Sequence, residues 1–284
     1  MKVPPTSFLF ITLDSCRWDT FQSTEAPHLK AVGPARRAWA PGYFTYASHS
    51  AMFMGFTPGD ALVQERFVNP KWAKIFRMEG GGQSPGKEPF CILEGNNVID
   101  GLKRAGYFAV GTGSVDWFDD SKPTTRPLTA DFDRYWYAGN VWSLAKQLAF
   151  LEKEIDGAGG RPVFAFLNVG ETHVPYWHEG APWSNAPEAN PCKPFAKDND
   201  AAECRRRQAA CLRFVDAALA PLLDAFRAAN TIICADHGDA WGEDGVWAHG
   251  IHHLKVLEVP LILRLQNPPE GPKKKGLLGR VLGR

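Results

Sequence analysis

Asp236 and His237 place a carboxylate and an imidazole side by side, directly after the apolar run of residues 232–235. A run of this length and composition is typical of a buried strand, and the following Gly238 allows the backbone to turn sharply. Burial of either side chain without a partner is costly, so a bound metal ion would explain why both stand there. An isolated Asp-His-Gly motif is more often an exposed loop with incidental histidines. The metal interpretation therefore depends on whether other strands end in the same way.

Two further apolar runs also end in groups that could bind a metal. Residues 7–13 lead into Asp14, and residues 162–169 lead into Glu171 and His173. Asp14 by itself would suit a capping role at the next turn or helix. In an open α/β sheet, however, the carboxyl ends of such strands converge in one crevice. The three strand ends together predict a shared site that contains Asp14, Glu171, His173, Asp236 and His237.

Residues 42–55 contain a hydroxyl group that could act as a nucleophile. Their apolar spacing predicts a short helix that ends at Gly55, with Ser48 as its N-cap. Thr45 then lies just ahead of a helix N-terminus, where free N–H groups and the helix dipole favour an anion. Within reach of a metal ion, its hydroxyl could be activated for attack. The alternative is that Thr45 simply fills a β-like connection.

The elements that would carry these side chains alternate between strands and helices. The strand over residues 7–13 is too continuously apolar to have a solvated face, which is typical of a parallel sheet covered on both sides. The helix predicted over residues 201–229 leads directly into the strand that begins at Thr231, so a βα alternation is present. The predicted fold is therefore α/β and doubly wound, with a mostly parallel central sheet and helices on both faces.

A chain of 284 residues can bury a full core, and we assign residues 1–266 to a single α/β domain. Two stretches rich in Gly, Pro and polar residues, 57–97 and 177–200, are predicted to be irregular insertion loops. The basic segment 267–284, which contains three consecutive lysines, is predicted to be a disordered tail.

Composition restricts the partners that the chain could have. A net charge of +1 provides no field suited to nucleic acid. No stretch has the length of a transmembrane segment, and residues 8–13 are too short for the core of a signal peptide, so no stable membrane insertion is expected. The six cysteines show no Cys-x-x-Cys pair. We interpret them as reduced thiols of a cytoplasmic protein.

Four segments together resemble the alkaline phosphatase superfamily, in particular its sulfatase-like and phosphonate-hydrolase-like branches. They are FLFITLDSCRWD, FTYASHSAMFMGFTP, ETHVPY and ADHGDAWGEDGVWAHG. The segment HHLKVLEVPLIL is similar to the strand that closes the core of that fold. The resemblance extends over most of residues 7–264 and implies an alkaline-phosphatase-like fold.

The resemblance also implies a role for individual residues. Asp14, Thr45, Asp236 and His237 would bind one divalent ion, and Thr45 would be the nucleophile. His173 and His249 would contact the transferred group or protonate the leaving group. A mixed nitrogen and oxygen ligand set favours zinc or manganese over calcium. The implied activity is hydrolysis of a phosphate or phosphonate ester, a small anionic substrate, through a covalent phospho-enzyme.

The chain departs from the family pattern in three respects. The formylglycine motif of sulfatases is matched only by Cys192-Lys193-Pro194-Phe195-Ala196, which lacks the final Arg, so sulfatase-like activity is the weaker alternative. A second metal would have only Glu171, His173 and His249 as ligands. The short chain implies a reduced C-terminal subdomain. Phosphotransferase or mutase activity, and a non-catalytic anion-binding protein of the same fold, remain alternatives.

Overall fold

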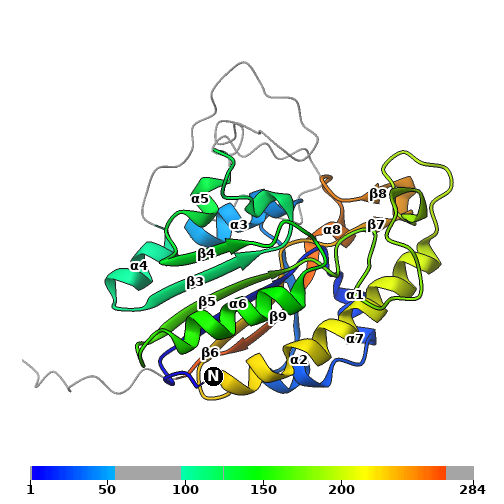
Figure 1. Cartoon of the computed structure of the whole chain (residues 1–284). Helices are drawn as coiled ribbons and strands as arrows, with labels where there is room; N and C mark the ends of the chain where they lie inside the picture. The colour runs from blue at the N-terminus through cyan, green and yellow to red at the C-terminus, as the bar shows by residue number, and fades with distance from the viewer. Residues whose placement is uncertain (1, 55–96, 124, 267–284) are drawn as a thin grey trace, which may run out of the picture.

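The computed structural model describes residues 2–54, 97–123 and 125–266 (Figure 1). The predicted tail 267–284 and all of the predicted insertion 57–97 except Asn97 lie outside the described residues. Residues 177–200 form an irregular excursion, in which the one regular element is the 3-10 helix η2 (Pro187–Ala189). Within the described part of the chain, no helix is both long and apolar enough to cross a membrane.

The core of the fold is a seven-stranded sheet in the order β2-β9-β6-β1-β5-β3-β4. Its strands are β1 (Phe8–Leu13), β2 (Arg36–Trp39), β3 (Phe108–Gly113), β4 (Arg134–Tyr137), β5 (Val163–Val169), β6 (Asn230–Ala235) and β9 (Glu258–Arg264). The five strands from β6 to β4 pair in parallel, and β9 runs antiparallel to its neighbours β6 and β2. The predicted mostly parallel sheet is therefore confirmed.

Helices cover both faces of this sheet (Figure 1). They are α1 (Trp18–Ser23), α2 (Pro27–Val32), α3 (Thr45–Met54), α4 (Val98–Arg104), α5 (Arg126–Thr129), α6 (Leu144–Asp156), α7 (Ala201–Ala225) and α8 (Leu254–Leu257). Side chains of β1 alternate between the two layers: Leu9 and Ile11 join the core beneath α2, α6 and α7, whereas Phe10 joins the core beneath α3 and α4. Because both faces are apolar, β1 has no alternating polar pattern, as the sequence predicted.

The register of the three central strands aligns their carboxyl ends. Leu13, the last residue of β1, lies level with Val169 of β5 and Ala235 of β6. Asp14 is the residue after Leu13 and Asp236 is the residue after Ala235, so the two acids leave the sheet at the same level. The convergence that the sequence predicted for these strand ends is therefore present, and it results from hydrogen-bonded pairing along each strand.

Two strands at the sheet edges, β2 and β4, were absent from the sequence analysis. Each has only four residues, most of them partly or fully exposed, so neither has the long apolar run that identifies a buried strand. The small ribbon of β7 (Ala240–Trp241) and β8 (Trp247–Ala248) was also not predicted. It folds the segment after His237 back on itself around the 3-10 helix η3 (Glu243–Gly245).

Glu171 follows β5, and its carboxylate contacts the backbone at the start of helix α6. Its Oε1 accepts a hydrogen bond from the backbone N–H of Leu144 at 2.9 Å, and its Oε2 has no partner among the described residues. Burial raises the pKa of Glu171 from 4.5 to about 7, because a charged carboxylate is poorly solvated there.

We predict that Glu171 makes folding pH-dependent between about pH 4.5 and 7. In that range the folded chain binds the Glu171 proton more tightly than the unfolded chain, so the free energy of unfolding falls as pH rises. Glu171→Gln should remove this fall, on the order of 3 kcal/mol, because the amide stays neutral and still offers an oxygen to Leu144. Urea denaturation at about pH 5 and about pH 8 measures the effect. The control is Glu152→Gln, an exposed position on α6, the helix whose start Glu171 contacts. An equal stability difference between Glu171→Gln and wild type at both pH values would contradict it.

Candidate active site and metal centre

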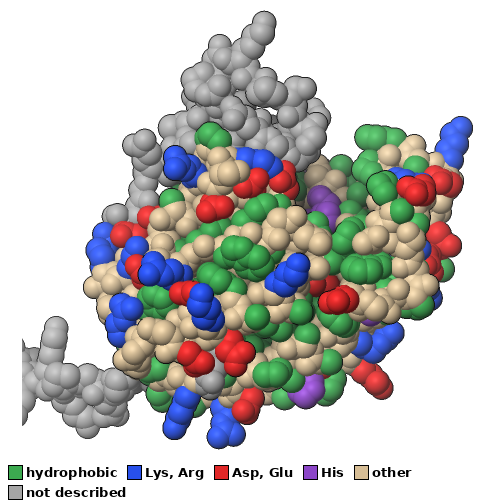
Figure 2. Space-filling view, in the orientation of Figure 1, with side chains coloured by type: hydrophobic (Ala, Val, Ile, Leu, Met, Phe, Trp, Pro, Cys, Tyr) green, Lys and Arg blue, Asp and Glu red, His purple; other side chains and the backbone are tan. Residues whose placement is uncertain are grey.

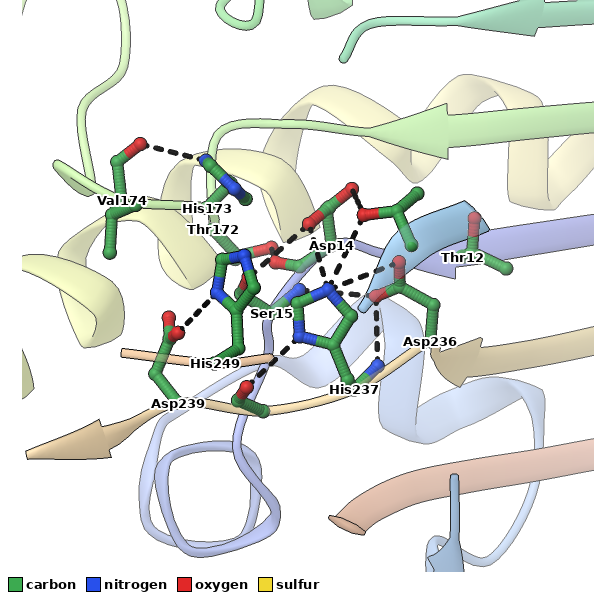
Figure 3. A network of polar contacts seen from close by, with 12 residues as sticks. Thr12, Asp14, Ser15, Thr172, His173, Val174, Asp236, His237, Asp239 and His249 are labelled. Atoms are coloured by element: carbon green, nitrogen blue, oxygen red, sulfur yellow. Dashed lines mark hydrogen bonds and ion pairs between the residues drawn. The ribbon is translucent and has the colours of Figure 1, made fainter. Parts of the chain in front are cut away.

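The ends of β1 and β6 bring three predicted metal ligands together (Figure 3). One ligand atom each from Asp14, Asp236 and His237 lies within 4.8 Å of the other two, and all three side chains are fully buried. His237 Nε2 is 3.8 Å from Asp14 Oδ1 and 3.6 Å from Asp236 Oδ2. The group therefore has the residue types and the proximity that a small cation requires.

The electrostatics of this group also fit a cation. Burial, together with the charge of Asp14, raises the pKa of Asp236 well above its usual range. Asp236 Oδ2 is buried and has no hydrogen-bond partner within the described part of the chain. Burial and the neighbouring His249 lower the pKa of His237 to about 3, so its ring is neutral. Its Nδ1 lies 3.0 Å from the Gly238 carbonyl oxygen, which can only accept a hydrogen bond. The proton must therefore be on Nδ1, which leaves the Nε2 lone pair facing the carboxylates.

Backbone and side-chain donors hold the two carboxylates in place. The backbone N–H of Ser15 donates to Asp236 Oδ1 at 3.2 Å, and Asn168 Nδ2 donates to Asp14 Oδ2 at 3.2 Å. Asn168 lies near the end of β5 and was not identified from the sequence, where an amide within an apolar run is the only signal. A close backbone approach makes glycine necessary at position 238, since a Cβ there would lie 2.3 Å from the carbonyl oxygen of Lys255.

Thr45, the predicted nucleophile, is the first residue of helix α3. Its Oγ1 donates a hydrogen bond to Asp14 Oδ2 at 3.3 Å and lies 3.3 Å from His237 Nε2. The prediction that Ser48 caps this helix is wrong. The backbone N–H of Ser48 already donates to the carbonyl of Phe44 at 3.1 Å, and the helix begins at Thr45, four residues earlier than predicted. Thr45 consequently lies within the first turn, where backbone N–H groups have no partner inside the helix.

His49 is a further site residue that the sequence analysis did not assign. It lies one turn after Thr45 on α3, and its Nδ1 is 2.8 Å from the Thr45 carbonyl oxygen. Its Nε2 lies 2.9 Å from the hydroxyl of Thr12 on β1. Burial lowers the pKa of His49 to about 4, so the neutral ring donates at one nitrogen and accepts at the other. His49 thereby fixes the start of α3 against β1. Its spacing of four residues from Thr45 was the available signal.

The other two predicted histidines lie beside His237. The ring centre of His249 is 4.4 Å from that of His237 and 5.3 Å from that of His173 (Figure 3). Histidine side chains are visible in a hollow between the main body and the lobe that carries β7 and β8 (Figure 2). The structure therefore brings His173 and His249 to the same place as the three candidate ligands.

Asp239 anchors His249 and was missed in the sequence analysis, although it lies two residues after His237. Asp239 is fully buried, and its Oδ1 accepts a hydrogen bond from His249 Nδ1 at 2.7 Å. Its Oδ2 accepts one from the Tyr176 hydroxyl at 2.8 Å, which in turn accepts one from Trp241 Nε1 at 2.8 Å. Burial acts in the opposite direction, yet the charge and hydrogen bond of Asp239 raise the pKa of His249 above its usual value.

The buried Arg17 fixes the turn that contains Asp239. Its guanidinium donates to the Asp239 carbonyl at 3.2 Å and to the carboxylates of Asp19 and Glu243 at 2.6 to 2.8 Å. It also lies 4.1 Å from the ring centre of Trp241. These contacts join the segment after β1 to the segment after β6, so the two halves of the site are held in one arrangement.

Glu171 does not join the metal-ligand group. Within the described residues, Asp14, Asp236 and His237 form the one cluster of His, Cys, Asp and Glu whose ligand atoms are close enough for an ion. Glu171 instead bonds to the start of α6. The arrangement among the described residues therefore favours a single metal over a second site built from Glu171, His173 and His249.

Comparison with known proteins is consistent with this geometry. A sequence model of the Sulfatase family matches residues 92–276, which is more than half of the chain. Comparison with curated proteins gives no match. The C-terminal periplasmic domain of the phosphoethanolamine transferase EptC from Campylobacter jejuni aligns with a TM-score of 0.61 and 13% identity, covering 93% of this chain and 80% of that one.

Two further solved structures show the same fold. The C-terminal periplasmic domain of EcEptC from Escherichia coli, solved in complex with Zn, aligns with a TM-score of 0.59 and 11% identity, covering 91% of this chain and 72% of that one. The phosphonate monoester hydrolase of Agrobacterium radiobacter aligns with a TM-score of 0.58 and 15% identity, covering 92% of this chain and 68% of that one. The chain therefore belongs to the sulfatase family and has the fold of the alkaline phosphatase superfamily.

Proposed function

We propose that the chain is a metal-dependent hydrolase of phosphate or phosphonate esters in which Thr45 is the nucleophile. The observation that carries this proposal is the position of Thr45 Oγ1, 3.3 Å from both Asp14 Oδ2 and His237 Nε2. The hydroxyl therefore lies beside the candidate ligand atoms and at the N-terminal end of a ten-residue helix. A nucleophile, a cation site and helix N–H groups in one place suit the transfer of an anionic group.

Asp14, Thr45, Asp236 and His237 are the residues that would hold one divalent ion. The mixed nitrogen and oxygen ligand set favours zinc or manganese over calcium, and the zinc complex of EcEptC supports zinc. When bound, such an ion lowers the pKa of a coordinated hydroxyl and neutralises charge on the transferred group.

The other steps of the reaction are assigned to residues of the chain itself. Thr45 Oγ1 forms the new bond to phosphorus while the bond to the ester oxygen breaks, and Asp14 already accepts the hydroxyl hydrogen of Thr45. The N–H groups of the first turn of α3 favour the negative charge of the transferred oxygens. His249, held by Asp239 through Nδ1, presents Nε2 for protonation of the leaving oxygen. Water then attacks the phospho-Thr45 intermediate and regenerates the hydroxyl.

Transfer to an alcohol is the second candidate, because the same covalent intermediate serves both reactions. It is supported by the name of the EptC domain, a phosphoethanolamine transferase with the same fold. Turnover of a chromogenic phosphodiester with and without added alcohol distinguishes hydrolysis from transfer. A hydrolase releases the chromophore and a phosphate monoester in both cases, whereas a transferase is accelerated by the alcohol and forms a new phosphodiester with it. Sulfate esters are the weaker substrates in this proposal, since the formylglycine motif is incomplete.

The purified chain should contain about one equivalent of zinc or manganese, and Asp236→Ala should lose most of it, because Asp236 Oδ2 has no hydrogen-bond partner in the described ranges and is available to an ion. Elemental analysis of gel-filtered protein measures the metal content. Asp239→Asn is the matched control, since both Asp239 oxygens are occupied by His249 and Tyr176. Equal, substoichiometric metal in wild type and Asp236→Ala would show that the site does not hold an ion.

Thr45→Ala should abolish turnover, by roughly 10³-fold or more, while the fold and the metal content persist. Thr45→Ser should retain part of the activity because it keeps the hydroxyl. Mass spectrometry of acid-quenched protein, with a slow substrate, should place a phosphoryl group on Thr45. Ser48→Ala is the control, since Ser48 offers a buried hydroxyl without a partner in the same turn. An adduct on Ser48 or Ser50, or full activity of Thr45→Ala, would refute the assignment.

Asp239 should act as a positioning residue for His249. Asp239→Asn removes the charge that raises the pKa of His249, so turnover of an alkyl phosphate, whose leaving group needs a proton, should fall by roughly 10²-fold. Turnover of a nitrophenyl phosphate, which leaves without a proton, should fall much less, and KM should change little. Tyr176→Phe, which removes only the second partner of Asp239, should show a smaller change. Equal losses for both substrates would mean that Asp239 has only a structural role and does not act through His249.

A further inference from the structure

Two cysteines meet at the base of the excursion formed by residues 177–200. Cys192 lies in this excursion and Cys204 lies in the first turn of α7. Both are fully buried and belong to a small apolar cluster that also contains Tyr176 and Trp241. Both are free thiols. The cluster is separate from the two larger cores of the sheet, so it forms the contact between the excursion and the rest of the fold.

The side chains and the backbone of this pair are in direct contact. The Cys192 thiol lies close enough to the Cys204 thiol to raise its pKa. Cys204 Sγ also donates to the carbonyl oxygen of Pro191, the residue before Cys192, at 3.3 Å. The same carbonyl accepts the backbone N–H of Asp200, the N-cap of α7, at 2.9 Å. The two cysteines are therefore held together by backbone contacts that do not depend on the sulfur atoms.

We propose that Cys192 and Cys204 form a disulfide bond when the chain folds in the presence of a disulfide oxidant. One thiolate attacks the oxidant, which forms a mixed disulfide and releases one thiol of the oxidant. The second cysteine then attacks the mixed disulfide, which forms the Cys192–Cys204 bond and releases the second thiol. Two cysteine thiols are oxidised, one oxidant disulfide is reduced, and the two protons pass to the released thiols. This proposal does not rest on the proposed activity.

The environment of the pair decides when the bond can form. Contact with Cys192, together with burial, raises the pKa of Cys204 far above its usual range, so the attacking thiolate is scarce in the folded chain. Burial also excludes the oxidant. Exchange should therefore be slow in the native protein and fast before the excursion packs on α7. In a reducing compartment both residues would stay thiols.

The cross-link would also stabilise the surroundings of Asp239. The Cys192 thiol lies 3.7 Å from the carbonyl oxygen of Ala240, the residue after Asp239, and Trp241 packs in the same cluster. A disulfide would close a short loop between the excursion and α7, which lowers the entropy of the unfolded chain. We expect it to fasten the excursion to the segment that carries Asp239.

The test uses the full chain, synthesised in a cell-free reaction with either a glutathione redox buffer or excess dithiothreitol. Trypsin places the two cysteines in separate peptides, residues 154–197 and residues 198–205, because the Arg161–Pro162 and Lys193–Pro194 bonds resist cleavage. In the redox buffer, these peptides should appear as one linked species that separates on reduction. Thiol titration of the denatured chain should find six thiols after dithiothreitol and two fewer after oxidation.

Variants and stability complete the test. Cys204→Ser should abolish the linked peptides, whereas Cys211→Ser, which removes another buried thiol of the same cluster, should leave them unchanged. The oxidised wild type should have a Tm roughly 5 to 10 °C above the reduced form, and Cys204→Ser should not show this difference. Six free thiols in a folded chain made in the redox buffer would overturn the proposal. Linkage of Cys192 or Cys204 to other cysteines at equal frequency would overturn it as well.

Discussion

The site depends on holding two carboxylates, Asp14 and Asp236, close together and away from water. The pairing of β1 with β6 sets this proximity, because Leu13 lies level with Ala235 and each acid is the next residue of its strand. Repulsion and loss of solvation would separate such a pair in an unconstrained chain. Hydrogen bonds along both strands prevent that separation. The central sheet therefore holds two acidic groups in one buried space, and the residues around them orient these groups without neutralising them.

Most of the neighbours of these carboxylates are neutral hydrogen-bond donors. Ser15 N–H, the amide of Asn168 and the hydroxyl of Thr45 each donate one hydrogen bond, but none carries a charge. The ring of His237 is neutral as well, because burial and His249 keep its pKa low. Partial dipoles of this kind orient carboxylates without cancelling their charge. A divalent cation would supply the positive charge that these groups lack. Asp236 Oδ2, which has no hydrogen-bond partner among the described residues, indicates where that charge would be needed.

Two imidazoles 4.4 Å apart have opposite properties in this site. His237 is neutral with an unprotonated Nε2, whereas Asp239 raises the pKa of His249. The difference comes from the partner of each Nδ1, a backbone carbonyl for His237 and a buried carboxylate for His249. Environments that push the pKa values of two neighbouring groups apart assign different roles to them. His237, at the end of the sheet, is thus suited to bind the cation beside Thr45. His249, in the loop that follows, is suited to donate a proton.

The sequence by itself determined which strands end in reactive groups, since a continuous apolar run followed by an acid or an imidazole is readable at any single strand. It also indicated the doubly wound class, because helices and buried strands alternate along the chain. Only the tertiary structure decided which of these groups meet. Glu171 and Asp14 both follow buried strands, yet Glu171 bonds to the start of α6 and Asp14 faces His237. Strand order, register and the packing of helices set these directions, and all three depend on contacts between residues far apart in the chain.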